Sequence, residues 1–291
     1  MDILEFKTKI EKPCVMCLGY FDAMHKGHTH IIQTAYNLAK EKGLLLVVFL
    51  FTGGKNNSPD IFTFEERLIK LKVLNVDAVI YQKLDKEFMS LSSKEFTDLL
   101  FSNYNIKYVL TGNDYNYGKN KSGNTQTLKE EALKHNGELI TVNEVSLFGE
   151  KISTQTIKQH LTNGDIVKAN ALLGSNYFIR ERVIKGKELG KTIGFPTINM
   201  KLSKDKLLLG SGVYITMTII DGKPYSCITN VGSQPTVNGE DFVVETYIKN
   251  FDGNLYDKKM SIYFVEKIRD VKNFESLEKL KEQLKLDLEL I

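Results

Sequence analysis

Apolar runs alternate with segments of helical periodicity from residue 14 to about residue 175. Residues 44–51 are eight consecutive apolar residues, which is typical of a central strand in a parallel sheet that helices cover on both faces. Residues 78–81 and 108–111 form shorter runs of the same kind. Because strands separated by helices are joined by right-handed crossovers, this part is predicted to be an α/β fold with a doubly wound parallel sheet.

The starts of two helices can be read between these strands. Thr63 with Glu66, and Ser92 with Glu95, have the spacing of a capping box. In such a box each side chain accepts a hydrogen bond from the backbone N–H of the other residue. We therefore expect helices to begin directly after Thr63 and Ser92.

Beyond residue 177 the pattern changes to short β-rich runs separated by turn residues. Asp221-Gly222 and Asp252-Gly253 are typical of hairpin turns. The strands are expected at residues 214–220, 225–229, 242–248 and 260–268. Several short strands joined by tight turns predict a small, closed, all-β barrel.

A single helix is predicted to end the chain, with Ser276 as its N-cap. It carries one apolar stripe, formed by Leu277, Leu280, Leu284, Leu288 and Ile291. We interpret this stripe as a docking face rather than a cofactor-binding element. The change of pattern places the domain boundary near residue 176, which gives an α/β domain over residues 1–176 and a barrel domain over residues 177–291.

Composition and charge are those of a soluble globular protein, with 42% hydrophobic and 26% charged residues among 291. The net charge of +3 is too small to indicate nucleic acid or an anionic membrane as a partner. No apolar stretch approaches the roughly 18 residues of a membrane span, and the first residues do not resemble a signal peptide. We expect a cytoplasmic protein.

Cys14 and Cys17 form a CxxC pair, which can indicate zinc or redox chemistry. The pair lies within an apolar run that is typical of a buried strand, where residues three apart point to opposite faces. No second CxxC completes a zinc site. We therefore favour a structural role for both cysteines over a metal or redox role.

The first strand leads into a segment that carries candidate chemistry. Gly19 and Phe21 end the strand, and His25, Gly27 and His28 follow as an HxGH motif at the start of a helix, expected from about residue 29. Backbone N–H groups and the helix dipole favour an anion at such a position, and Gly27 allows the backbone to approach it closely.

The two imidazoles of this motif can donate hydrogen bonds to phosphate oxygens whose charge grows during transfer. No residue of the motif looks like a nucleophile, so direct displacement at phosphorus is the expected chemistry. The alternative is a solvated loop with two ordinary histidines. The pairing of the histidines, the glycine and the strand-to-helix context favour the phosphate site.

This arrangement resembles the nucleotidylyltransferase superfamily. Residues 112–118, Gly-Asn-Asp-Tyr-Asn-Tyr-Gly, are similar to a loop of its bacterial FAD synthetase branch, and residues 152–158 occupy the place of a Ser-Ser-Thr-x-x-Arg helix start. The resemblance implies that Thr154 and Lys158 hold ATP phosphates and that Asp114 lies near the bound flavin. It implies phosphate-binding or catalytic roles for Gly19, Phe21, His25, Gly27 and His28.

The chain departs from this family pattern at three places. Asp22 is followed by Ala23 where the family has glycine, and residues 51–55 replace a Pro-His-Pro. In the late motif, Thr154, Gln155 and Lys158 replace the second serine, a threonine and an arginine. Lysine keeps the positive charge but loses the two-pronged hydrogen bonding of arginine.

A glycine-rich segment lies near the start of the barrel region. Gly186, Gly190, Lys191 and Thr192 almost form a Walker A motif, but the spacing between the glycines is one residue short. Pro196 follows, and it would break the helix into which a P-loop must run. A P-loop is therefore rejected, whereas a glycine-rich loop that cradles phosphates without a helix remains possible.

Residues 189–199, Leu-Gly-Lys-Thr-Ile-Gly-Phe-Pro-Thr-Ile-Asn, closely resemble the riboflavin kinase signature. Further matching segments follow in the family's order up to the end of the chain, at residues 212–214, 230–236, 245–247, 251–256 and 268–269. The resemblance covers residues 177–291. It implies a six-stranded barrel, in agreement with the strand pattern.

The riboflavin kinase resemblance implies specific roles. Thr197 and Asn199 offer neutral oxygens to Mg²⁺ and phosphate, and Glu245 is the candidate base for the ribityl 5′-hydroxyl. Arg269 lies in a segment that borders the flavin site in the family. The implied ATP- or phosphate-binding residues of this domain are Gly186, Gly190, Lys191, Thr192, Thr197 and Asn199.

Together the two resemblances imply that riboflavin and ATP give FMN, and that FMN and ATP give FAD and pyrophosphate, with Mg²⁺ needed in both steps. The partners would be small molecules: riboflavin, FMN and ATP. Two alternatives remain, a riboflavin kinase with weakened or lost adenylyl transfer and a flavin-binding regulator that does not convert its ligand. Because a regulator would not need a base and metal ligands together, the residues favour an enzyme.

Overall fold

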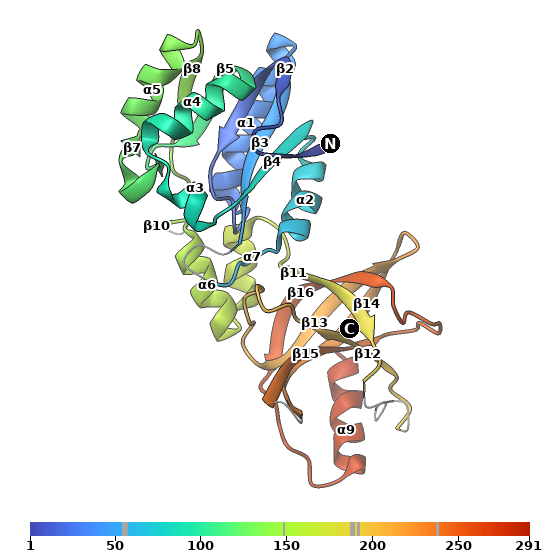
Figure 1. The fold of residues 1–291 in the computed structure, drawn as a ribbon. Helices are drawn as coiled ribbons and strands as arrows, with labels where there is room; N and C mark the ends of the chain where they lie inside the picture. Colours follow the sequence, from blue (N-terminus) through green and yellow to red (C-terminus); the bar gives the residue numbers. More distant parts are fainter. Residues whose placement is uncertain (54–57, 148, 187–189, 191–192, 237–238) are drawn as a thin grey trace. The chain divides into compact units, whose positions relative to one another are not determined.

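The computed structural model describes residues 1–53, 58–147, 149–186, 190, 193–236 and 239–291 (Figure 1). The chain divides into two compact units, residues 1–154 and residues 155–291. Across these described ranges, no helix is long and apolar enough to cross a membrane.

A six-stranded parallel sheet forms the centre of the first unit, as the alternating pattern predicted. Its strands lie in the order β1-β4-β3-β2-β5-β8. Their bounds are β1 Asp2–Glu5, β2 Ile10–Leu18, β3 Leu45–Thr52, β4 Ala78–Lys83, β5 Tyr104–Gly112 and β8 Glu138–Val142. The chain builds the sheet outward from β2 to one side and then, from β5, to the other. The predicted doubly wound topology is confirmed.

Helices connect these strands at α1 Lys26–Lys42, α2 Phe64–Val73, α3 Lys86–Ser90, α4 Ser93–Asn103 and α5 Thr125–Lys134. Both predicted capping boxes are present, at Thr63 with Glu66 and at Ser92 with Glu95. The expected start of the first helix at about residue 29 is wrong, because α1 begins at Lys26. The His25 side chain caps this helix, so the helix starts inside the HxGH motif.

Cys14 and Cys17 lie fully buried on β2 and are free thiols. Burial raises the pKa of the Cys14 thiol to about 12 and raises the pKa of Cys17 as well. Neutral thiols of this kind pack as small apolar side chains. Their surroundings agree with the structural role inferred from the apolar run.

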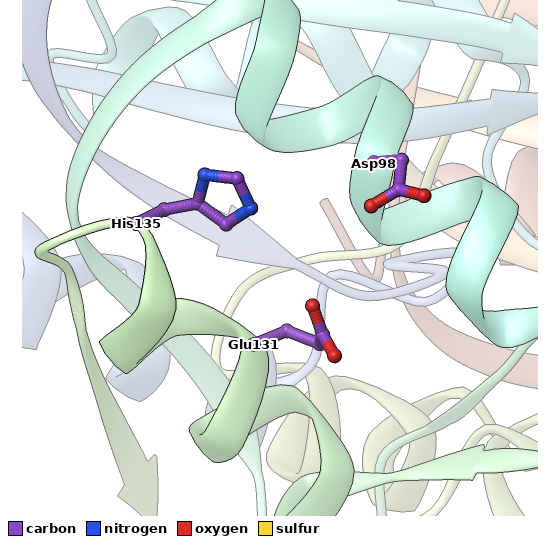
Figure 2. A group of neighbouring side chains, drawn as sticks. All are labelled: Asp98, Glu131 and His135. Atoms are coloured by element: carbon purple, nitrogen blue, oxygen red, sulfur yellow. The ribbon is translucent and has the colours of Figure 1, made fainter.

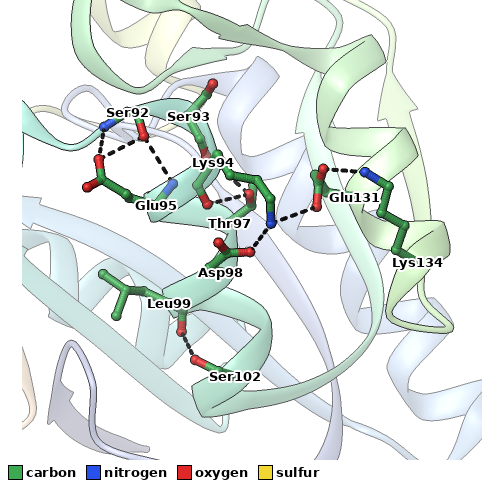
Figure 3. Close-up of polar contacts among 10 residues, drawn as sticks. All are labelled: Ser92, Ser93, Lys94, Glu95, Thr97, Asp98, Leu99, Ser102, Glu131 and Lys134. Atoms are coloured by element: carbon green, nitrogen blue, oxygen red, sulfur yellow. Dashed lines mark hydrogen bonds and ion pairs between the residues drawn. The ribbon is translucent and has the colours of Figure 1, made fainter.

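Four charged side chains link α4 to α5 on the surface of the first unit (Figure 3). Lys94 pairs with Asp98 one turn further along α4 and lies 3.7 Å from Glu131 of α5. Lys134 pairs with the same glutamate at 2.7 Å. Lys94 therefore bridges carboxylates of both helices, whereas Lys134 pairs within α5.

A closed antiparallel barrel dominates the second unit, as predicted. The strands follow one another in the order β11-β12-β15-β14-β13-β16. Their bounds are β11 Phe178–Ile184, β12 Thr197–Lys201, β13 Gly212–Ile220, β14 Lys223–Thr236, β15 Gly239–Ile248 and β16 Lys259–Arg269. Inside it, a chain of hydroxyl contacts joins Thr216, Thr229 and Thr246 over 2.6 and 2.9 Å.

The two predicted hairpin turns differ in outcome. Asp221 and Gly222 join β13 to its neighbour β14, with φ angles of 49° and 78°. The Asp252-Gly253 prediction is wrong, because β15 and β16 are not neighbours. Closing the barrel requires β16 to pair with β11 and β13, so residues 249–258 form a longer connection.

Helices α6 (Thr154–Asn163) and α7 (Ile166–Leu173) precede the barrel in sequence. The side chain of Asn170 in α7 forms two hydrogen bonds with the barrel unit. Its Nδ2 donates to the Phe264 carbonyl at 2.9 Å, and its Oδ1 accepts from the Tyr177 N–H at 2.7 Å. The compact unit accordingly begins at Gln155. The boundary near residue 176 was predicted between the two catalytic domains, which is a different division from that of the compact units, and it stays a prediction.

The last helix, α9 (Leu277–Leu288), is capped by Ser276 as predicted. Four members of the apolar stripe are partly buried, but Leu277 remains 46% exposed. The buried residue of α9 is Asp287. The docking face is therefore shorter than the sequence pattern indicated, and an acidic residue lies within it.

Candidate functional site

A pocket of about 760 Å³ opens in the first unit beside the carboxyl ends of β2 and β5. The strand order reverses between these two strands, which is where open α/β sheets bind their ligands. Of the residues singled out in the sequence, it is lined by Gly19, Phe21, His25, Gly27, His28, Asp114 and Thr154. The structure thus brings segments more than 100 residues apart to one cavity.

His25 has a defined protonation pattern. Its Nδ1 accepts a hydrogen bond from the His28 backbone N–H at 3.2 Å, at the N-terminus of α1. Burial lowers the pKa of His25 to about 4, so the ring is neutral at pH 7. Because Nδ1 is an acceptor, the proton of the neutral ring lies on Nε2. His25 can therefore donate one hydrogen bond through Nε2.

The two imidazoles stack, with ring centroids 3.6 Å apart and planes 11° apart. Burial lowers the pKa of His28 well below its ordinary value, and the adjacent His25 lowers it further. Among the described residues, the buried Nδ1 of His28 has no hydrogen-bond partner. A polar atom left in this way at a pocket wall is suited to contact a ligand.

Close backbone contacts explain the glycines of this segment. A Cβ on Gly19 would lie 2.8 Å from the Phe21 ring, and one on Gly27 would lie 3.1 Å from the His25 ring. Phe21 is fully buried with a φ angle of 51° and packs edge-on against His28 at 5.2 Å. Phe21 thus acts as a support for the histidines, whereas a phosphate contact of its own stays a prediction.

Asp114 follows β5 and reaches the pocket wall with 72% of its side chain exposed. Lys151 pairs with Asp114 at 3.4 Å and also bonds Glu144. Neither contact of Lys151 was expected from the sequence. Lys151 follows Asp114 by 37 positions and Glu144 by 7 positions in the chain. The role of Asp114 beside the flavin stays a prediction.

One wall of the pocket is aromatic, and sequence reasoning missed it. Its rings are Phe51, Phe88, Phe96, Tyr115 and Tyr117. Tyr115 and Tyr117 stack at 5.8 Å, and Tyr117 packs against Phe96 at 5.5 Å. A wall of this kind suits a flat aromatic ligand. The sequence offered only one signal, the Tyr-Asn-Tyr alternation in the loop after β5.

The late motif is divided between the two units. Thr154 lines the pocket, while Lys158 lies one turn further along α6 in the unit that begins at Gln155. The roles of both residues at ATP phosphates stay predictions.

The second group of predicted residues lies on the barrel. Asn199 of β12 pairs directly with Glu245 of β15 in the strand register, and Thr197 lies two residues before Asn199. The Thr197 hydroxyl donates a hydrogen bond to Glu245 Oε1 at 2.7 Å. The adjacent positions Met200 and Val244 are fully buried and point to the opposite face of the sheet. The three polar residues therefore share the outer face of the barrel.

Two glycines of the predicted phosphate loop approach these residues. A Cβ on Gly186 would lie 2.3–2.8 Å from the side chain of Asn199, and one on Gly190 would lie 2.3 Å from the Phe195 carbonyl oxygen. The Gly190 carbonyl accepts from the Phe195 N–H at 2.8 Å, which turns the chain back toward Thr197. Lys191 and Thr192 lie outside the described residues.

A smaller pocket of about 220 Å³ adjoins Glu245. It is lined by Ser211, Asn230, Gly232, Ser233, Val243, Glu245 and Val271. Asn230 pairs with Glu245 across β14 and β15, so a second amide flanks the carboxylate. Sequence reasoning noted Asn230 within a matching segment but gave it no role, because only the strand register reveals the pairing.

Arg269, predicted to border the flavin, forms an ion pair with Asp287 of α9. Its Nη2 lies 2.6 Å from Asp287 Oδ2, and its Nε donates to Oδ1 at 3.0 Å. The two side chains are only 14% and 3% exposed. The structure shows Arg269 holding the last helix, and its contact with flavin stays a prediction.

A third group of polar side chains lies away from both pockets. Figure 2 shows Asp98 of α4 with Glu131 of α5 and His135, the residue that caps the end of α5; their potential metal-ligand atoms all lie within 4.8 Å of one another. Lys94 and Lys134 already pair with the two carboxylates, and the His135 ring stacks on Phe101 at 4.9 Å. We interpret this group as part of a salt-bridge cluster between α4 and α5.

Comparisons with known proteins match both parts of the chain. A family model described as FAD synthetase matches residues 7–156, and one described as riboflavin kinase matches residues 173–291. A bifunctional riboflavin kinase/FMN adenylyltransferase of Bacillus subtilis is 33% identical over 94% of this chain and 90% of its own length. The protein of that name from Escherichia coli K12 is 29% identical over 95% of this chain and 91% of its own length.

The fold is also shared with a solved structure. The crystal structure of a protein from Streptococcus pneumoniae, named as a macrolide-efflux protein, superposes with a TM-score of 0.90 at 30% identity. The match covers 100% of this chain and 98% of the other. Both domains, their order and their near-complete coverage confirm the resemblance seen in the motifs. The chain belongs to the family of bifunctional riboflavin kinases/FMN adenylyltransferases.

Proposed function

We propose that the barrel uses Mg-ATP to phosphorylate riboflavin and that the α/β region uses Mg-ATP to adenylylate the resulting FMN. The observation that carries the first half is the hydrogen bond from Thr197 to Glu245 beside Asn199. The observation that carries the second is the pair of neutral, stacked histidines at the N-terminus of α1. Family membership supports both reactions.

In the kinase reaction Glu245 accepts the proton of the ribityl 5′-hydroxyl. That oxygen forms a bond to the γ-phosphorus of ATP while the bond from this phosphorus to the β,γ-bridging oxygen breaks, so FMN and ADP leave. Thr197 fixes Glu245 Oε1, which leaves Oε2 to take the proton. The pocket beside Glu245 and Asn230 receives the flavin.

The donor set around Glu245 suits Mg²⁺. Thr197 and Asn199 provide neutral oxygens next to one carboxylate, and Asn199 is only 6% exposed. Hard oxygen donors of this kind, combined with ATP phosphates, are what Mg²⁺ selects. When bound, Mg²⁺ neutralises phosphate charge. Gly186 and Gly190 let the backbone approach the phosphates, and Lys191 and Thr192 complete the proposed loop.

In the adenylyl transfer the FMN phosphate attacks the α-phosphorus of ATP and pyrophosphate leaves. His25 donates to a phosphate oxygen through Nε2, and His28 acts beside it. Gly19, Gly27 and Phe21 shape the phosphate site, while Thr154 and Lys158 hold the ATP phosphates. Asp114 lies beside the flavin, and the aromatic wall stacks on its ring system.

The catalytic domains are proposed to meet near residue 176. The match to the riboflavin kinase model, which begins at residue 173, supports this position. Because both reactions consume ATP, we place the enzyme in the cytoplasm. Its proposed partners are riboflavin, FMN and ATP rather than nucleic acid or a membrane.

Incubation of the protein with riboflavin and Mg-ATP, followed by chromatographic separation of the flavins, tests this proposal. FMN and FAD together are expected. FMN alone would favour a kinase without adenylyl transfer, and unchanged riboflavin would favour a flavin-binding regulator.

A further inference from the structure

The charged side chains that line the large pocket of the first unit are not all paired with one another. Among its described lining residues, the ammonium groups are those of Lys121 and Lys151, and the carboxylates are those of Asp114 and Glu144. Lys151 pairs with both carboxylates. Within the described part of the chain, the Lys121 amine has no ion-pair partner, so it is the one cation of this wall that remains available to a ligand.

The turn that carries Lys121 is held firmly in place. The short strands β6 (Asn116–Tyr117) and β7 (Gly123–Asn124) pair on either side of it. The Lys119 N–H donates to the Leu91 carbonyl at 2.7 Å, and a Cβ on Gly118 would lie 2.6 Å from the Ser93 nitrogen. The turn is thus packed against the start of α4.

The backbone of this turn adopts a costly conformation. Asn120 and Lys121 have φ angles of 55° and 57°, and such left-handed backbone is uncommon for residues other than glycine. Strain of this kind persists where the surrounding structure enforces it, often at ligand sites. Lys121 of this strained turn is one of the residues that line the pocket.

Lys121 and the histidines reach the same pocket from different elements of the fold. His25 and His28 come from the end of β2 and the start of α1, where the ATP phosphates are proposed to lie. The turn instead adjoins Leu91 and Tyr117, and Tyr117 packs on Phe96 of the aromatic wall at 5.5 Å. The turn that carries Lys121 therefore adjoins the aromatic wall, on which the flavin ring is proposed to stack.

We propose that Lys121 binds the 5′-phosphate of FMN and so selects FMN over riboflavin in the adenylyl transfer. This inference rests on the proposed function. In the reaction an oxygen of the FMN phosphate forms a bond to the α-phosphorus of ATP, while the bond from this phosphorus to the α,β-bridging oxygen breaks and pyrophosphate leaves. FMN phosphate carries a charge of about −1.5 to −2 at pH 7. A cation beside the FMN phosphate offsets the repulsion between this phosphate and ATP and fixes the attacking group.

The test uses the full-length enzyme and initial rates of FAD formation, with FMN varied at saturating Mg-ATP and then ATP varied at saturating FMN. Lys121→Ala is compared with Lys121→Arg, which keeps the charge. Lys119→Ala is the matched control, because Lys119 lies in the same turn but outside the pocket lining. Lumiflavin, which lacks the ribityl chain and its phosphate, serves as a competitive inhibitor.

We expect Lys121→Ala to raise KM for FMN about 10- to 100-fold, the effect of a lost charge-assisted hydrogen bond. Its KM for ATP, its inhibition by lumiflavin and its kinase rate from riboflavin should stay within about threefold of wild type. Lys119→Ala should be unchanged, and Lys121→Arg should keep most of the affinity for FMN.

An unchanged KM for FMN in Lys121→Ala, or an equal rise in Lys119→Ala, would overturn the inference. A rise in KM for ATP instead would assign the amine to ATP and would also overturn it. An absence of FAD from the wild-type enzyme would be a different result, because it would refute the adenylyl transfer itself.

Discussion

The Thr197 hydroxyl donates a hydrogen bond to Glu245 Oε1 at 2.7 Å, from one barrel strand to the next. This contact joins the residue expected to contact Mg-ATP to the residue expected to accept the substrate proton. It holds the carboxylate through Oε1, and the proposed mechanism assigns Oε2 to the riboflavin hydroxyl.

Replacing Thr197 by valine, which has nearly the same shape, should lower the kinase rate about 10- to 100-fold, because a hydrogen bond to a charged group is lost. The measurement is the initial rate of FMN formation, with a melting curve as a check on folding. Thr197→Ser retains the hydroxyl and should recover most of the rate. A valine variant with wild-type activity would mean that the contact has no catalytic role.

Asn199→Ala should shift the Mg²⁺ dependence of the kinase to higher concentrations, because it removes a buried oxygen donor beside Thr197. A Mg²⁺ titration of the FMN-forming rate measures this shift. Asn230→Ala is the control, since Asn230 flanks Glu245 on the opposite side in the same strand register. If the titration curves of Asn199→Ala and wild type coincide, Asn199 is only a packing residue against Gly186.

His25 should make the folded state less stable as the pH falls. Burial lowers its pKa to about 4 in the folded protein, while the unfolded chain binds the proton near pH 6.5. Between these values the unfolded state holds more protons, so stability is lost as pH falls through this window. The loss should reach about 2 kcal/mol at pH 5.

Thermal or denaturant unfolding at pH 7 and pH 5 checks this expectation. His25→Asn should weaken the pH dependence, whereas replacement of the exposed His30 by asparagine should preserve it. An identical pH dependence in His25→Asn and wild type would show that His25 is not held neutral by burial.

Asp287→Ala should destabilise the barrel unit by about 3–5 kcal/mol, because it leaves the largely buried Arg269 side chain without its carboxylate partner. Urea unfolding measures the change. Glu282→Ala on the same helix breaks only the exposed pair with Lys279 and should cost no more than about 1 kcal/mol. Equal effects of the two substitutions would contradict a structural role for the Arg269–Asp287 pair.

The sequence predicted those features that depend on local pattern. The capping boxes at Thr63 and Ser92 and the turn at Asp221-Gly222 follow from neighbouring residues, and all three are confirmed. The Asp252-Gly253 hairpin failed, because strand pairing around a closed barrel depends on residues far apart in the chain.

Parts of the candidate sites could not be predicted from the sequence either. The aromatic wall is assembled from β3, α3, α4 and the loop after β5, and the pairing of Arg269 with Asp287 depends on where α9 docks. Single residues such as Phe88 or Asp287 read as ordinary core or surface positions until tertiary packing is known. Motif resemblance singled out His25, Thr197 and Glu245 because they lie in short local signatures, and their catalytic roles stay predictions.

The most direct test of the account is the rate of both reactions in Glu245→Gln. With riboflavin and saturating Mg-ATP, FMN formation should fall about 10²- to 10⁴-fold, while FAD formation from added FMN and the melting curve should match wild type. Glu266→Gln, an exposed glutamate on β16, is the control for both rates. FMN formation within threefold of wild type in Glu245→Gln would contradict the assignment of Glu245 as the base of a riboflavin kinase.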